Sequence, residues 1–173
     1  MCVCVILAMT GHASVICVLA EGAAPGLERK VAVLPEHPRS KDLAAALQHN
    51  KAITTLDLFD NGIDDEGGKA LAEALQHNST LISLNLPLNG IGAEGGKALA
   101  EALQHNSMLC TLNLKYNDIG DEGGKAFLKA LRQNATVTNL NLHKNGISEE
   151  ILKQVDRALA LLARIGGRTR NTW

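Results

Sequence analysis

The sequence has few aromatic residues and almost no net charge. Phe, Tyr and Trp make up 2% of its 173 residues, which is too little for a surface that stacks the bases of single-stranded nucleic acid. The formal net charge is −1. Because nucleic acids and anionic membranes bind through an excess of Lys and Arg, neither is expected as the main partner. Only Arg164, Arg168 and Arg170 make the C-terminal end locally basic, and such tails are more often solvated.

Cysteine is also scarce where it would matter for folding. Cys2, Cys4 and Cys17 all lie in one apolar run near the N-terminus, and only Cys110 lies elsewhere. That distribution excludes a disulfide framework for the rest of the chain. A reduced thiol is the simplest interpretation of Cys110.

What the sequence does contain is a repeat of 28 residues. Residues 67–79 return letter for letter at 95–107. The same offset aligns four copies of the pattern Leu-x-Leu-x-x-Asn, whose first leucines are Leu56, Leu84, Leu112 and Leu140. Self-similarity at a fixed period of this length is the signature of a solenoid. A solenoid works as a surface that binds, so the architecture predicts how the protein acts but not what it binds.

Each repeat begins with a strand and continues into a helix. Leu56 and Leu58 alternate as in a strand with one buried face. A favoured helix N-cap follows, and a Glu stands two residues later, where the helix dipole favours a carboxylate. The four N-cap positions are Asp64, Gly92, Gly120 and Ser148. The strand and the helix that follows it should therefore recur in every repeat.

The helix of each repeat carries a single apolar stripe that can cover the strand. In the first full repeat the stripe consists of Ala70, Leu71, Ala74 and Leu75. Asn78 stands at the end of this helix, and its equivalents are Asn50, Asn106 and Asn134. We expect these asparagines to close the helices in the left-handed conformation.

These residues resemble the leucine-rich repeat family. The 28-residue length with a full helix is similar to its ribonuclease-inhibitor-like subtype, which also occurs in nucleotide-binding leucine-rich repeat receptors and in the Ran GTPase-activating protein. The resemblance covers about residues 41–159. It implies an α/β fold, a right-handed β-α superhelix that forms a short horseshoe with a parallel sheet inside and helices outside. No arginine stands in the four strands or strand-to-helix loops, so the catalytic arginine of a GTPase-activating role has no candidate.

The repeat pattern divides the chain into four parts. Residues 1–24 are a hydrophobic N-terminal run, 25–50 a degenerate capping repeat, 51–147 the leucine-rich repeats, and 148–173 a C-terminal capping helix and tail. Within the capping repeat, residues 31–34 are predicted to pair in parallel with the strand at 54–58, which would cover the edge of the sheet. The last helix is expected to stop at Gly166 and Gly167.

The N-terminal run leaves the cellular location open. Residues 1–22 have the features of a signal peptide, although no Lys or Arg precedes the run. A membrane anchor over residues 2–20 and a hydrophobic cap on the repeats are the alternatives. The resemblance favours a cytoplasmic protein. Secretion is the alternative if the signal peptide is cleaved, and in that case Asn78 and Asn134 would be in glycosylation sequons.

No residue constellation predicts catalysis, a cofactor or a metal. The Gly67-Gly68-Lys69 run lacks the earlier glycine and the following Ser or Thr of a phosphate-binding loop. His49, His77 and His105 form a column, but neighbouring helices lie roughly 8–10 Å apart, whereas a zinc–nitrogen bond is about 2 Å. We therefore predict that the protein is not an enzyme and has no cofactor or metal site.

The candidate site consists of the outward-facing positions that the repeat does not explain. These positions differ between repeats while the helical positions recur. They predict acidic contacts with a partner in the first repeat, apolar and aromatic contacts in the middle, and basic contacts in the last. The predicted partner-binding residues are Asp57, Phe59, Asp60, Asn85, Leu88, Asn113, Lys115, Tyr116, His143 and Lys144.

The sequence thus predicts a non-enzymatic protein–protein interaction module that binds a protein partner through its sheet face. A regulator that inhibits or activates a GTPase or a hydrolase is the first alternative, and a secreted recognition protein is the second. Four short strands offer a few hundred Å², which is less than the roughly 800 Å² per partner of a standard interface. The chain is therefore expected to bind weakly, to belong to a longer array, or to add loop or cap surface to the contact.

Overall fold

The computed structural model describes residues 16–20, 29–33 and 40–169. The predictions for most of the N-terminal run, for Leu34 and for the last four residues lie outside the described residues. The elements, in chain order, are β1 (Ile16–Ala20), β2 (Arg29–Val33), α1 (Ser40–His49), β3 (Thr55–Asp57), α2 (Asp65–His77), β4 (Ser83–Asn85), α3 (Ala93–His105), β5 (Thr111–Asn113), α4 (Gly120–Leu131), β6 (Asn139–Asn141) and α5 (Glu149–Thr169).

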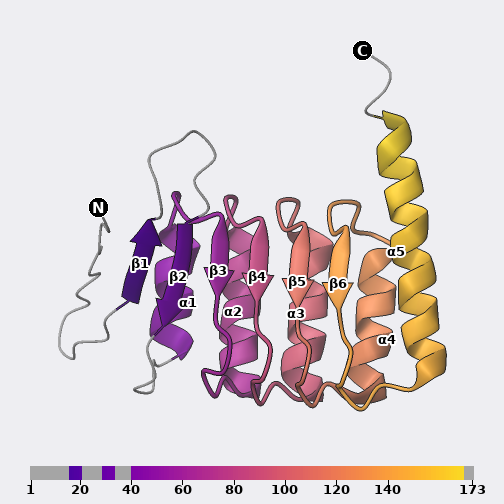
Figure 1. Cartoon of the computed structure of the whole chain (residues 1–173), viewed down its shortest axis with the longest axis horizontal. Helices are drawn as coiled ribbons and strands as arrows, with labels where there is room; N and C mark the ends of the chain where they lie inside the picture. Colours follow the sequence, from indigo (N-terminus) through magenta and orange to yellow (C-terminus); the bar gives the residue numbers. More distant parts are fainter. Residues whose placement is uncertain (1–15, 21–28, 34–39, 170–173) are drawn as a thin grey trace.

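Strands and helices form two layers, with one six-stranded sheet backed by the helices on a single face (Figure 1). The strands stand side by side in chain order, and β2 to β6 are parallel. The repeat sets the register, because Leu56 pairs with Leu84, Leu84 with Leu112 and Leu112 with Leu140. The predicted fold class, a short leucine-rich repeat solenoid with alternating strands and helices, is therefore confirmed.

The N-terminal edge of the sheet carries a feature that the sequence did not predict. β2 joins β3 in parallel through Ala32 and Asp57, as expected for the segment at 31–34. β1 then adds an antiparallel strand outside β2, with Ile16 opposite Val33 and Ala20 opposite Arg29. Part of the hydrophobic run therefore pairs with the sheet edge. Cleavage or anchoring of this run stays a prediction.

The core lies between the sheet and the helices. Leu56, Leu58 and the equivalent leucines of the other repeats are buried, as are Leu71 and Leu75 on the stripe of α2. Burying a leucine side chain contributes about 1.5–3 kcal/mol, so the repeat's apolar pattern accounts for the layer packing. None of the helices within residues 40–169 is both long and apolar enough to cross a membrane.

The repeated glycines allow neighbouring helices to approach closely. A Cβ added at Gly68 would lie 3.1 Å from the Cα of Gly95 in the next helix, and one added at Gly96 would lie 2.9 Å from a methyl carbon of Ile119. The contact at Gly68 is between helices of successive repeats, which explains why the glycine pair recurs with the repeat.

The asparagines at the helix ends do not adopt the predicted conformation. Asn78 and Asn106 are extended, with φ −80° and ψ near 125°, and both are buried. Asn106 Nδ2 donates to the carbonyl oxygens of Leu75 (2.7 Å) and Asn78 (3.1 Å), and its Oδ1 accepts from the N–H groups of Met108 and Leu109. Asn78 and Asn134 donate to the preceding repeat in the same way, so these three asparagines each tie their own turn to the repeat before it. The left-handed prediction was wrong because these bonds between repeats require the extended backbone.

The structural role of these asparagines also bears on the two sequons. Asn78 and Asn134 are 3% and 5% exposed, and the Nδ2 atom that would carry a glycan is hydrogen-bonded in both. The folded repeat therefore has no room for a glycan at either position.

A second series of buried asparagines, Asn89, Asn117 and Asn145, links neighbouring repeats in the turns that follow the strands. Asn89 Nδ2 donates to the carbonyl oxygens of Leu58 and Leu86 at 3.0 Å, and its Oδ1 accepts from the N–H groups of Asn61 and Ile63. Asn117 and Asn145 make the same two donated bonds, and each accepts from one N–H group, that of Ile91 and that of Ile119 respectively. The strand-to-helix turns are consequently fixed by buried side chains, so the residues that they expose are held in place.

The last helix is longer than the others and continues beyond the sheet (Figure 1). It runs through Gly166 and Gly167 to Thr169, so the predicted stop at the two glycines was wrong. Glycine lowers helix propensity by only about 1 kcal/mol per residue, which weakens a helix without removing its hydrogen bonds.

Candidate protein-binding face

Two sets of residues make up the candidate site. The open face of the sheet, which we call the sheet face, carries Asp57, Phe59, Asn85, Asn113, Lys115 and His143. The turns directly after the strands carry one residue per repeat, which we call the turn row: Asp60, Leu88, Tyr116 and Lys144. Members of the turn row are 28 residues apart and lie on neighbouring repeats. On the sheet face, Asp57, Asn85 and Asn113 are also 28 residues apart, whereas Phe59, Lys115 and His143 each lie two residues beyond the end of a strand.

A polar ladder runs across the sheet face. Asn85 Nδ2 donates to Asp57 Oδ1 at 2.9 Å, and Asn113 Nδ2 donates to Asn85 Oδ1 at 2.6 Å. All three side chains are half-buried. Because the ladder already uses these polar atoms, a partner gains fewer new hydrogen bonds from Asn85 than its position in the sequence suggested.

The same polar residues turn the chain out of the strand. Asp57 Oδ1 accepts from the N–H of Phe59, and Asn113 Oδ1 accepts from the N–H of Lys115, each at 3.1 Å. The second repeat has Pro87 at the equivalent position, which has no N–H to donate. These local bonds fix where the strand ends and so determine where the turn row begins.

The turn row has an unusual backbone conformation. Its four residues have φ between 53° and 60°, the left-handed region that side chains other than Gly, Asn and Asp seldom occupy. The N–H groups of the first three are used within the array: Asp60 donates to Pro87, Leu88 to Lys115 and Tyr116 to His143, at 3.0–3.1 Å. A partner at these three turns therefore meets side chains rather than free N–H groups.

The apolar members of the site face solvent. Phe59 is 53% exposed, Leu88 45% and Tyr116 43%. Leu88 and Tyr116 are neighbours in the turn row, whereas Phe59 belongs to the sheet face of the preceding repeat. The structure thus brings two of the three predicted apolar contacts together and places the third one position away from their row.

Charge changes sign along the array. Asp57 and Asp60 belong to the first of these repeats, whereas His143 and Lys144 belong to the last. Between them the Nζ atom of Lys115 lies 4.8 Å from the centre of the Tyr116 ring, a cation–π contact. The face is therefore acidic at one end, apolar in the middle and basic at the other.

Two exposed apolar residues at the other ends of the strands, where the chain enters them from the helices, were not predicted from the sequence. Ile82 precedes β4 and is 42% exposed, and Met108 lies in the next helix-to-strand loop. The sequence carries a signal for Ile82, because the equivalent positions in the other repeats hold Thr54, Cys110 and Thr138 rather than a large aliphatic residue. Ile82 and Met108 give a control surface of similar chemistry at a different edge.

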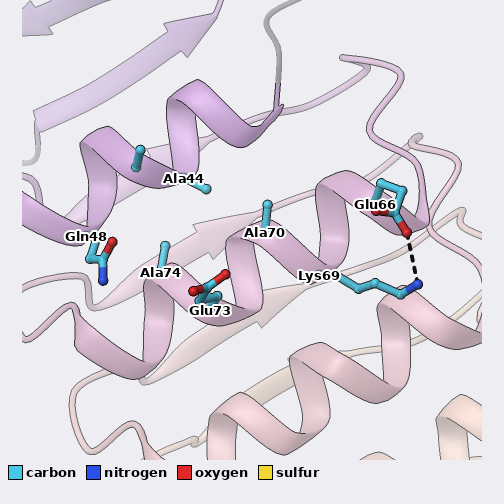
Figure 2. A pocket seen from close by; sticks show the side chains of 8 residues that line it. Ala44, Gln48, Glu66, Lys69, Ala70, Glu73 and Ala74 are labelled. Carbon is cyan, nitrogen blue, oxygen red and sulfur yellow. Dashed lines mark hydrogen bonds and ion pairs between the residues drawn. The ribbon is translucent and has the colours of Figure 1, made fainter.

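The helix layer contains a hollow of about 500 Å³ between α1 and α2 (Figure 2). Its floor is formed largely by small side chains, including Ala44, Ala70 and Ala74. At one end Lys69 is bonded to Glu66 at 3.0 Å, so these charges neutralise each other. The hollow thus offers neither a large apolar surface nor converging unpaired charges, and it is a weaker candidate than the sheet face.

Ion pairs on the helices follow the repeat and lie away from the site. Lys69–Glu66, Lys97–Glu94 and Lys125–Glu122 are each spaced i, i+3 with 2.9–3.0 Å between charged atoms. The hydrogen bond from Lys125 lowers the pKa of Glu122 and raises the pKa of Lys125. In the part of the chain that the structure describes, His, Cys, Asp and Glu side chains form no group of three that could hold a metal ion.

The repeats match a known family. Residues 49–72, 77–100 and 105–128 match the family model described as Leucine Rich repeat. Together with the sheet topology, these matches show that residues 49–128 form leucine-rich repeats. No curated protein sequence matches the chain.

Solved structures share the fold, and two of them serve as examples. One is described as Leiomodin-1 Actin-Binding Site 2, with a TM-score of 0.66 and 24% identity over 76% of each chain. The other is the tropomodulin C-terminal domain of Caenorhabditis elegans, with a TM-score of 0.64 and 18% identity over 76% of this chain and 80% of that one. At these identities the likeness concerns the fold.

Proposed function

We propose that the protein is a non-enzymatic interaction module that binds a protein partner through the sheet face and the turn row. The observation that carries this proposal is the exposure of Phe59, Leu88 and Tyr116 on a scaffold whose other large apolar residues are mostly buried. Large exposed apolar and aromatic side chains grouped with charged neighbours are typical of binding sites. The ribonuclease-inhibitor-like subtype and a cytoplasmic location remain predictions within this proposal.

Actin is the first partner to test. The leiomodin structure that shares this fold is described as an actin-binding site. The test is co-sedimentation of the purified chain with actin filaments. A regulator of a GTPase or hydrolase is the alternative, and it is favoured if a captured partner is such an enzyme and its turnover changes when the chain is added.

The test of the binding face uses three forms of the purified protein. The wild-type chain, a Phe59→Ser, Leu88→Ser, Tyr116→Ser variant and a control Ile82→Ser, Met108→Ser variant are compared by quantitative pull-down and by circular dichroism. We expect all three to be folded and only the first variant to lose the partner. If only the Ile82→Ser, Met108→Ser control loses partner binding, the site lies at the helix-to-strand loops. If every form still binds the partner, the proposal is overturned.

A further inference from the structure

The turn row contains residues that the fold itself does not favour. Leu88 and Tyr116 have φ of 55° and 58°, where a side chain with a Cβ is strained, and they also expose apolar surface to water. Asn at the same place would tolerate the left-handed backbone and leave no apolar surface exposed. Both side chains nevertheless leave nearly half of their surface in water, and Tyr116 is covered on one face only by the ammonium group of Lys115. A bound partner would bury this remaining apolar surface, which gives a reason for Leu and Tyr at two positions where Asn would fit the backbone better.

The backbone of the site limits what that partner can be. The N–H groups of Asp60, Leu88 and Tyr116 already donate to carbonyl oxygens of the next repeat. An extended peptide lying across the strands would find few groups to satisfy its own backbone, and unpaired buried backbone groups are costly. A helix satisfies its backbone internally and offers only side chains, which is what this surface can accept.

The spacing of the row also fits a helix. Neighbouring strands lie about 4.8 Å apart, close to the helix pitch of about 5.4 Å. A helix with its axis along the row therefore presents one side chain per turn to each repeat. An extended chain places side chains on the same side only about every 6.6 Å. Its side chains would therefore fall out of register with the repeats within the length of the row.

The charges set the direction of such a helix. Asp60 stands at one end of the row and Lys144, beside His143, at the other. An isolated helix is stabilised by acidic residues in its first turn and basic residues in its last. With that charge order, its N-terminus lies over Lys144 and its C-terminus over Asp60.

We infer that the turn row binds an amphipathic helix of about three turns that lies across the strands. Leu88 and Tyr116 contact its apolar stripe, and Lys144 and Asp60 contact its acidic first turn and basic last turn. This inference rests on the proposed function, since it names the class of partner for the same surface.

The probe is a lactam-bridged helical peptide of about 14 residues. It has two leucines one turn apart, Glu in the first turn and Lys in the last turn, all on one face. Binding to the full chain is measured by fluorescence anisotropy. The control peptide has the same composition without the bridge and with proline between the leucines, which prevents the helix. We expect the bridged peptide to bind at least about tenfold more tightly than the control.

Two kinds of protein variant separate anchoring from folding and charge. Leu88→Asn and Tyr116→Asn should each weaken peptide binding about tenfold, while the thermal midpoint stays the same or rises because strain is removed. Lys144→Glu should weaken binding of the original peptide and be rescued by a peptide whose first-turn Glu is replaced by Lys. A fall in the thermal midpoint of the Asn variants, or absence of rescue, would overturn the inference.

The outcome also separates this inference from the proposed function. Equal binding of the bridged and proline peptides would show that the occupant is not a helix. If the triple serine variant loses its protein partner but no helical peptide binds the wild-type chain, the helical partner is wrong and the binding face stands. If the protein partner still binds the triple serine variant, both the proposed binding face and the inference of a helical partner are wrong.

Discussion

The carboxylate of Asp65 accepts a hydrogen bond from the N–H of Gly95 at 2.6 Å, although the two residues belong to successive helices. The same oxygen accepts from the N–H of Gly92 at 2.9 Å. Gly92 is the N-cap of α3 and has no side chain that could cap it. Asp65 therefore caps the following helix from the preceding repeat, which links two repeats through a helix terminus.

Removing this cap should destabilise the array. We expect Asp65→Ala to lower the free energy of unfolding by about 0.5–2 kcal/mol, the usual cost of losing a helix cap. Glu101→Ala, an exposed change on α3, is the control and should stay within about 0.5 kcal/mol. Urea denaturation followed by circular dichroism measures both. Equal midpoints for the two variants would mean that the hydrogen bonds of Asp65 contribute nothing net.

The next repeat lacks the equivalent cap and should gain from receiving it. Position 93 is Ala, and α4 begins at Gly120 with φ 63° after Ile119, without a side-chain cap. Ala93→Asp would place a carboxylate where Asp65 stands one repeat earlier. We expect a gain of about 0.5–1 kcal/mol, seen as a higher thermal midpoint. The matched change Ala93→Asn, which keeps the acceptor but not the charge, should give a smaller gain.

The repeat explains why so much of the fold could be predicted from the sequence. Leu56 and Leu58 indicated the buried strand face, and the 28-residue offset gave the register of β3 to β6. Gly120 was predicted as an N-cap, but the assigned helix begins there, with φ 63° at Gly120 and its N–H donated to the carbonyl oxygen of Asn145. Contacts of this kind involve residues nearly one repeat apart, which periodicity within a single repeat does not show.

The candidate site was less accessible to sequence reasoning. Leu88 and Tyr116 were predicted to contact a partner because they follow the outward-facing strand positions, but their left-handed backbone was not predicted, since neither residue type favours it. The hydrogen bonds that join Asn85 to Asp57 and Asn113 were also missed. Identical or similar polar residues at equivalent positions can bond across strands, and that is the signal that would have found the ladder.

The buried asparagines at the helix ends should be among the most sensitive polar positions. Asn106→Ala removes two bonds donated to carbonyl oxygens and two accepted from N–H groups, and it leaves those buried groups without partners. We expect a cost of roughly 2–4 kcal/mol. Asn139→Ala, at an exposed position in β6, should change stability by no more than about 0.5 kcal/mol. Similar losses of stability in both variants would show that the cost comes from replacing asparagine at any position, not from the burial of the Asn106 amide.

The pairing of Glu122 with Lys125 should appear in a pH titration. The hydrogen bond from Lys125 lowers the pKa of Glu122, so its stabilising effect is present above the pKa of the unfolded chain and is lost as pH falls through the lower folded value. Carbon-detected NMR should show the Glu122 carboxyl titrating below its ordinary range. Lys125→Met should return the midpoint to that range, and an unchanged midpoint would show that the pair does not persist in solution.

The assignment of inward and outward strand positions can be tested with one pair of variants. Leu86 is fully buried between sheet and helices, whereas Lys115 lies on the open sheet face with its ammonium group against the Tyr116 ring. Leu86→Ala should cost roughly 2–5 kcal/mol, because it removes buried apolar surface and leaves a cavity. Lys115→Ala should cost about 0.5–1 kcal/mol at most, since it removes only an exposed cation–π contact. Denaturation midpoints measure both, and equal losses would place Lys115 in the core. The same two variants can be used in the binding assay. There Lys115→Ala should lower the affinity for the partner while its fold stays intact.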